Sequence, residues 1–306
     1  MKRNEVRTWI AGLALVLGLA VGQAGYAQGC SDAGLCTIPG VNTVAPQASR
    51  NTLKLGLSQG AGEEGVSIIS AFASWERKFS QRFGVHGKVT FLSSNGDLGN
   101  AAGLGDLFVS GSYRAATFES GELMLTGGVK LPLSQPDADA DGNDLPMAYQ
   151  VSQGTTDLLL GVLYTKSSFG VSFGFQQPLV QTEKNDFIPG AYFGSDYPIA
   201  RELKRQGDLL ARIFVTTHLE EQLRFQPGLL AIYHIAEDKF TDVNGVEREF
   251  DGSAGLTLNL NLLAAYQLSQ HNELELTLGF PLATRDVRPD GLTRSYVVGL
   301  EFSWGL

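Results

Sequence analysis

An acidic stretch carries the clearest metal-ligand spacing in the sequence. Asp137, Asp139 and Asp141 alternate with other residues and are followed by Gly142. Carboxylates at positions 1, 3 and 5 followed by a glycine match the first half of a calcium-binding loop. The glutamate expected at position 12 is absent, because Ala148 stands there. The stretch predicts either a weak calcium site in an external loop or a solvated acidic loop tip.

The histidines do not have the spacing of a hydrolytic site. A serine two positions from a histidine would share its face of a strand. The four histidines are instead followed at that distance by Lys88, Glu220, Ala236 and Glu273. Asp238 and Asp242 near His234 leave an acidic site of another kind open. We expect no catalytic residues, no enzymatic activity and no cofactor other than the calcium.

The N-terminal region predicts a secreted protein. Lys2, Arg3 and Arg7 precede an apolar run over 9–21, and small residues follow it up to Ala27. This pattern is typical of a signal peptide over 1–27 that is removed in the mature protein. A retained helical anchor and a lipoprotein signal remain alternatives.

The only two cysteines follow this predicted cleavage site. Cys30 and Cys36 are expected to form a local disulfide in an oxidising compartment, since a metal site would need further ligands. They belong to a segment over 28–50 that we interpret as a small plug or a periplasmic tail. The net charge of −9 argues against a nucleic-acid partner.

The rest of the chain, 51–306, alternates apolar and polar residues with the period of a β-strand. Leucines at 256, 258, 260 and 262 share one face, and leucines at 274, 276 and 278 share another. The pattern predicts twelve strands, with ten or fourteen as alternatives. The expected ranges are 51–60, 65–79, 83–94, 104–118, 121–134, 154–166, 169–182, 206–219, 222–236, 253–268, 272–285 and 292–306.

The connections between these ranges alternate in length. Every second one is tight, around Gln81, Ser120, Ser167, Glu221 and Gln270. The others are mostly long, at 95–103, 135–153, 183–205 and 237–252. Short periplasmic turns and long external loops are typical of an antiparallel up-and-down β-barrel in the outer membrane. A soluble β-sandwich or propeller is the alternative. An even strand number places both termini in the periplasm.

The last expected strand supports an outer-membrane location. Tyr296, Val298, Leu300, Phe302 and Trp304 lie on one face of it. This aromatic end resembles the terminal strand by which outer-membrane barrels are recognised for assembly. The resemblance implies outer-membrane lipid and the barrel-assembly machinery as partners, and a Gram-negative cell.

If the apolar residues face lipid, the residues that alternate with them face the lumen. A charged side chain on the lipid face costs about 2–4 kcal/mol at mid-membrane for Arg or Lys. Both signs occur, so no filter for one charge is predicted. The residues expected to face the lumen also include bulky apolar side chains, which either line an apolar passage or pack against a plug. The charged lumen residues are expected to be Lys54, His86, Lys88, Asp106, Arg114, Glu122, Lys130, Asp157, Asp208, Arg212, His218, Arg224, Glu273, Glu275 and Glu301.

Three segments carry a family resemblance. They are Gly103-Leu-Gly-Asp106 with its following strand, Gly127-Gly-Val-Lys-Leu-Pro-Leu133, and Gln153-Gly-Thr-Thr-Asp-Leu-Leu-Leu-Gly161. Their order resembles the outer-membrane transporters of the phenol-degradation MetA-pathway family, related to long-chain fatty-acid transporter barrels. The match covers about residues 100–180. Pro132 is followed by Leu-Ser where that family often has Thr-Gly.

The resemblance implies passive or hatch-gated uptake of small, hydrophobic or aromatic compounds. A non-transporting structural or adhesion barrel with a plugged lumen is the alternative. A continuous passage through the lumen would favour the first interpretation, and a filled lumen the second.

Overall fold

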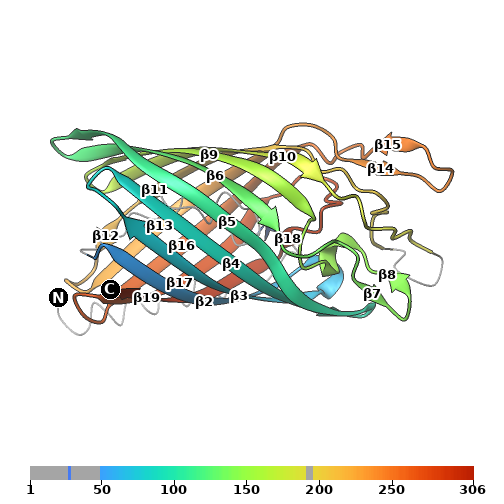
Figure 1. The fold of residues 1–306 in the computed structure, drawn as a ribbon, viewed down its shortest axis with the longest axis horizontal. Helices are drawn as coiled ribbons and strands as arrows, with labels where there is room; N and C mark the ends of the chain where they lie inside the picture. The colour runs from blue at the N-terminus through green and yellow to red at the C-terminus, as the bar shows by residue number, and fades with distance from the viewer. Residues whose placement is uncertain (1–26, 29–48, 191–195) are drawn as a thin grey trace.

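The computed structural model describes residues 27–28, 49–190 and 196–306. Within these ranges, twelve antiparallel strands form a closed barrel (Figure 1). No helix in the described part of the chain is long and apolar enough to cross a membrane. The predicted signal peptide lies outside the described residues except for Ala27, and the predicted disulfide lies wholly outside them. Both remain predictions.

The barrel strands follow one another around the ring in chain order. They are β2 (Asn51–Ala61), β3 (Ser67–Lys78), β4 (Phe83–Gly96), β5 (Gly99–Phe118), β6 (Gly121–Pro132), β9 (Thr155–Lys166), β10 (Phe169–Gln181), β11 (Asp208–Val215) continued by β12 (Thr217–His218), β13 (Leu223–His234), β16 (Gly255–Gln267), β17 (Asn272–Ala283) and β19 (Tyr296–Gly305).

The last strand closes the ring against the first. β19 pairs with β2 in the register Trp304↔Leu53 and Tyr296↔Ala61. Closure leaves no unpaired sheet edge, which is the condition for strands to cross a lipid bilayer. The twelve expected strands are thus confirmed, with small shifts at their ends.

The outer surface of the barrel is apolar. Leu55, Leu57 and Leu300 are 46%, 57% and 50% exposed, and neighbouring strands present further leucines and aromatics in the same way. The residues between them on each strand are buried or half-buried. This alternation follows from the two-residue period of the sequence.

The two ends of the barrel differ, as the connection lengths predicted. Short turns lie at the end where both β2 begins and β19 ends (Figure 1). Long connections over 133–154, 182–207 and 235–254 lie at the other end, which we call the mouth. The expected loop at 95–103 is wrong: β4 runs to Gly96 and β5 starts at Gly99, so this hairpin continues the wall beyond its neighbours.

Two short hairpins, two 3-10 turns and a short strand pair lie between the barrel strands. β7 (Asp139–Ala140) and β8 (Asn143–Asp144) form one hairpin, and β14 (Lys239–Thr241) and β15 (Glu247–Glu249) form another. The 3-10 turns are η2 (Glu63–Gly65) and η3 (Met147–Tyr149). β1 (Ala27–Gln28) pairs antiparallel with β18 (Thr293–Arg294), whose two residues are buried.

A compact apolar core joins the loops at the mouth. It combines η3 with residues of the 182–207 connection and the start of β3. Gly96 allows this packing, because a Cβ there would lie 2.3 Å from the Tyr149 hydroxyl. The buried members are Val66, Ile68, Leu145, Met147, Ala148, Tyr149, Phe187, Tyr197, Ala200 and Leu203.

Candidate functional site: a charged lumen with a closed mouth

Ion pairs line the wall near the short turns. Lys54 Nζ lies 2.7 Å from Glu301 Oε1, and Arg224 Nη2 lies 3.0 Å from Glu273 Oε1 and 3.6 Å from Glu275 Oε2. Lys54 and Glu301 lie on the neighbouring strands β2 and β19. Arg224 on β13 instead reaches across β16, where Ala265 lies between it and Glu275 of β17. The sequence alternation places the charges on the face opposite the exposed leucines.

A second group of charges lies on β5, β6 and β9. Lys130 Nζ is 3.0 Å from Asp157 Oδ2 and 4.0 Å from Asp106 Oδ2. Ser152 Oγ donates to Asp106 Oδ1 at 2.6 Å, which attaches the 133–154 connection to this group. Gln176 on β10 donates to Asp157 as well. The three residues taken from the glycine-rich motifs are thus brought together.

Other expected lumen residues are dispersed along the wall. Arg114 and Glu122 pair at 2.7 Å near a turn. Lys88 Nζ lies 4.0 Å from the centre of the Phe72 ring, and His86 and Arg212 are buried. His218 is exposed beside the turn that follows β12, so it does not join the buried lumen residues.

Six buried titratable side chains form what we call the mouth cluster. It consists of Arg205, Asp208, His234, Asp238, Arg285 and Asp290, each 3% exposed or less. Their positions combine the rims of β11 and β13 with the 182–207, 235–254 and 284–295 connections. The cluster therefore links three loops to the barrel wall.

Histidine stands at the centre of the mouth cluster. His234 Nδ1 lies 2.7 Å from Asp208 Oδ1, and His234 Nε2 lies 2.8 Å from Asp238 Oδ1. Asp208 also accepts from Arg205. The two carboxylates fix the ring from both sides. The arrangement contains no serine or cysteine nucleophile among these partners and resembles a structural network.

Two arginines connect the remaining carboxylates. Arg205 Nε lies 3.3 Å from Asp290 Oδ2, and Arg285 Nη1 lies 3.6 Å from Asp238 Oδ2. Arg285 also donates to Asp290. Burial alone would raise the pKa of Asp290, but the guanidinium groups of Arg285 and Arg205 outweigh it and hold that pKa well below its usual range.

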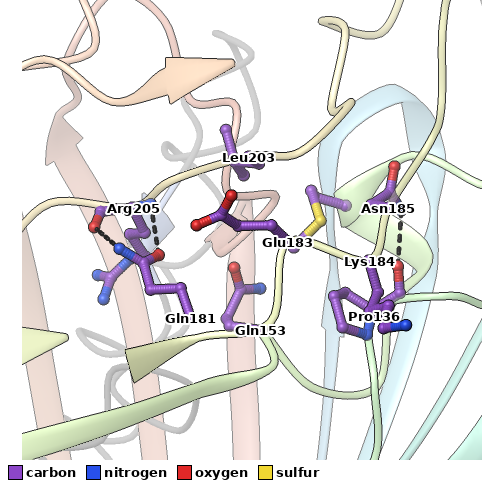
Figure 2. Close-up of a pocket in the computed structure, with 9 residues that line it drawn as sticks. Pro136, Gln153, Gln181, Glu183, Lys184, Asn185, Leu203 and Arg205 are labelled. Atoms are coloured by element: carbon purple, nitrogen blue, oxygen red, sulfur yellow. Dashed lines mark hydrogen bonds between the residues drawn. The ribbon is translucent and has the colours of Figure 1, made fainter. Parts of the chain in front are cut away.

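The 133–154 and 182–207 connections meet beside this cluster. Figure 2 shows a small pocket between them, lined by Pro136, Gln153, Gln181 and Arg205 among others. Gln181 Nε2 donates to the Arg205 carbonyl at 2.9 Å, and the Arg205 amide donates back at 2.8 Å. These reciprocal bonds hold Arg205 in place for its ion pairs.

The sequence reasoning missed Arg205, Arg285 and Asp290. Arg205 and Asp290 lie in connections without alternating residues, so periodicity gives no indication of their direction. Arg285 is the last residue of the expected strand 272–285, but β17 ends at Ala283, so Arg285 belongs to the following connection. Only the register of β11 and β13, which places Asp208 opposite His234, could have indicated a cluster here.

The acidic motif contributes no assembled metal site. Within the described residues, no three His, Cys, Asp or Glu side chains are arranged to hold a metal ion. Asp139 Oδ1 instead accepts from the Gly142 amide at 3.0 Å in the β7–β8 turn. The calcium site proposed for Asp137, Asp139 and Asp141 rests on their spacing alone.

Comparisons with known proteins bear on the fold. No family model and no curated protein matches the chain. A crystallised outer membrane channel from Pseudomonas putida F1 is similar in structure, with a TM-score of 0.60, 15% identity and coverage of 87% of this chain and 98% of that one. The NanC porin (TM-score 0.49, 8% identity, 84% and 100% covered) also matches. Outer membrane phospholipase A from Escherichia coli matches with a TM-score of 0.39, 10% identity and coverage of 84% of this chain and 92% of that one.

The match to the Pseudomonas channel confirms the expected resemblance to outer-membrane transport barrels at the level of the fold. At 15% identity, this likeness shows the fold alone and gives no information about solutes or binding sites. The chain therefore forms a closed twelve-stranded barrel whose fold is similar to that of the Pseudomonas channel.

Proposed function

We propose that this protein is a channel of the Gram-negative outer membrane that admits small solutes through its lumen. One observation carries the proposal: a closed ring of strands has an apolar exterior and a buried, charged interior. Buried ion pairs cost free energy relative to apolar packing of the same volume. A lumen lined with them is therefore better explained by a function of the lumen than by stability.

The transported solutes are small hydrophobic or aromatic compounds. An apolar wall on β5 and β9–β13 supports this, since an aqueous pore has little use for such side chains. Most charged lumen residues that the structure describes lie in pairs of opposite sign, and the described ones form no ring of one sign, so ions are poor candidates. The apolar wall consists of Phe108, Leu159, Leu163, Leu210, Phe214, Leu230 and Ile232, each 3% exposed or less.

Passage is gated at the mouth. The mouth cluster and the loop core hold three connections together across the end of the barrel. The 28–50 segment is proposed as a further plug. Its first residue, Gln28, pairs with Thr293 beside the mouth. The first barrel strand, β2, begins at Asn51 near the short turns at the opposite end.

A non-transporting barrel is the second candidate. The same burial of the apolar wall and of the mouth cluster favours it, because a permanently closed lumen would also show these features. In this case the barrel would anchor the β7–β8 and β14–β15 hairpins as an external surface for adhesion.

Conductance in planar bilayers separates the two candidates. The folded protein would be compared with variants lacking residues 30–50 and with Arg285→Met. Currents that appear or increase in either variant support a gated channel. Silence in all three, together with no uptake of aromatic solutes into liposomes, would contradict transport and leave the structural barrel.

A further inference from the structure

His234 has a carboxylate oxygen at hydrogen-bond distance from each of its two ring nitrogens. Nδ1 lies 2.7 Å from Asp208 Oδ1, and Nε2 lies 2.8 Å from Asp238 Oδ1. A neutral imidazole has one N–H donor and one lone pair, whereas an imidazolium has two donors. An ionised carboxylate only accepts, so a neutral ring would turn its lone pair toward one of the two aspartates. The geometry therefore corresponds to the imidazolium.

The charge of the mouth cluster leads to the same protonation state. Its two arginines carry +2 and its three aspartates carry −3, so the six side chains balance only when His234 holds a second proton. Each arginine contacts two of the aspartates, which favours the ionised form of these carboxylates. A buried charge without a partner is costly. Loss of the proton would leave one negative charge uncompensated among side chains that are 3% exposed or less.

The charged groups around His234 come from the wall and from three connections. In the strand register, Asp208 of β11 lies opposite His234 on one side, and Gly255 of β16 lies opposite it on the other side and carries no charge. The ring is thus the point where the charges of the loops meet the barrel wall. The connections supply Arg205 from 182–207, Asp238 from 235–254, and Arg285 and Asp290 from 284–295.

Asp238 is the carboxylate that a neutral ring would release. Asp208 lies in the barrel wall and also accepts from a guanidinium. Asp238 Oδ1 accepts from the Gln206 amide at 2.8 Å, and its Oδ2 lies 3.6 Å from Arg285 Nη1, which is too far for a hydrogen bond. The contact with the ring is therefore its strong charged bond. Release of Asp238 would free the start of the connection that carries the β14–β15 hairpin (Figure 1).

We propose that His234 is a proton-operated switch, which holds the 235–254 connection on the barrel rim while the ring is charged and releases it when the ring is neutral. An unperturbed histidine loses its proton near about pH 6.5, and paired carboxylates favour the charged ring. The contact is thus present in acidic solution and is lost as the pH rises into the alkaline range. The consequence for solutes, an opening of the mouth, rests on the proposed channel function.

The charge of the ring can be measured directly by NMR. Protein labelled with 15N-histidine in detergent micelles should show both His234 nitrogens protonated at about pH 6 and one of them unprotonated at about pH 9.5. The variant His234→Gln assigns the signal by removing it. A ring that is neutral at the lower pH, or still charged at the higher one, would overturn the switch whether or not the protein conducts.

Protease cleavage within 235–254 measures the release of the connection. The wild-type rate, normalised to a peptide substrate at each pH, should rise about tenfold from about pH 6 to about pH 9.5, as expected for loss of one charge-assisted hydrogen bond. His234→Gln should be cleaved rapidly at both pH values. His234→Lys keeps a cation beside the aspartates and should be cleaved slowly at both. The control is His218→Gln, which removes an exposed histidine beside a short turn and should follow the wild type.

Conductance over the same pH range separates failure of the switch from failure of the channel. A wild-type cleavage rate that does not change with pH, or an equal rise in His234→Gln, would overturn the switch even if the protein conducts. Cleavage that rises without any current at either pH would support the switch and contradict the channel. Folding of each variant is checked by far-UV circular dichroism. If His234→Gln does not fold, the NMR signals and cleavage rates of the wild type and His234→Lys decide the outcome.

Discussion

Lys130 Nζ lies 3.0 Å from Asp157 Oδ2 across the pairing of β6 with β9, and both side chains are almost completely buried. Removing one partner of a buried pair leaves an uncompensated charge and costs about 3–5 kcal/mol. We therefore expect Lys130→Met to lower the free energy of unfolding in urea by that amount. The double variant Lys130→Met with Asp157→Leu should regain most of the loss, because the buried carboxylate of Asp157 is removed with its cation and Asp106 still accepts a hydrogen bond from Ser152.

An exposed ion pair provides the control for this cycle. Arg248 Nε lies 3.1 Å from Asp242 Oδ2 in the β14–β15 region, and the Arg248 side chain is 58% exposed. Exposed pairs contribute about 0–1 kcal/mol, so Arg248→Met should leave the unfolding midpoint nearly unchanged. If Lys130→Met had an equally small effect, the buried pair would not support the barrel.

The mouth cluster predicts a gating variant. Arg285 contacts Asp238 and Asp290 from the connection between β17 and β19. Arg285→Met removes the shared cation, so the carboxylates repel one another and the connection should leave the wall. We expect a several-fold rise in mean conductance in planar bilayers, with no rise for the exposed Arg248→Met variant. An unchanged conductance would show that this cluster does not close the channel.

The low pKa of Asp290 sets the pH dependence of this closure. Its pKa lies below that of an unfolded Asp, which is about 3.9, since Arg285 and Arg205 outweigh the effect of burial. Its contribution to stability is therefore fully present above about pH 4 and is lost as the pH falls through the lower folded pKa.

Conductance measured from pH 7 to pH 3 tests this sign. The closed state should persist down to about pH 4 and weaken only below it. In Asp290→Asn the acid-induced change should be smaller, because the titrating carboxylate is gone. Opening that begins near pH 6 would assign the control to a different group.

Alternation predicted the wall of the barrel because the lipid-facing residues are apolar and many of their lumen-facing neighbours are polar or charged. Leu256 and Tyr266 mark one such face, and both are exposed in the barrel. The same logic failed at 95–103, where Asn95, Gly96 and Gly99 suggested a loop. Here Asn95 pairs with Asn100 and Gly96 with Gly99, so the small polar residues form a tight turn between two extended strands.

The mouth could not be predicted in this way. Its charges lie on connections whose paths depend on contacts between distant segments, such as Arg205 with Asp290 and Arg288 with Glu63. Neither composition nor period encodes such contacts. The lumen-facing side of β16 was predictable, since Asn259 and Asn261 alternate with leucines, but only the strand register shows that Gln226 lies beside them.

Gly291 gives a test of how the mouth is packed. Its φ of +63° favours glycine, and a Cβ there would lie 2.3 Å from the Ala148 amide nitrogen in η3. Gly291→Ala should therefore push the 133–154 connection away from the 284–295 connection. We expect faster cleavage by protease within 133–154 and a higher conductance than in the wild type.

Gly142 separates the effect of packing from that of backbone strain. Its φ of +80° is also unfavourable for alanine, but a Cβ there would meet no atom within 4 Å. The strain of a left-handed alanine costs about 1–2 kcal/mol at either site. Gly142→Ala should therefore disturb only the β7–β8 turn and leave conductance unchanged. Equal conductance of the two variants would mean that contact between the two connections does not hold the mouth closed.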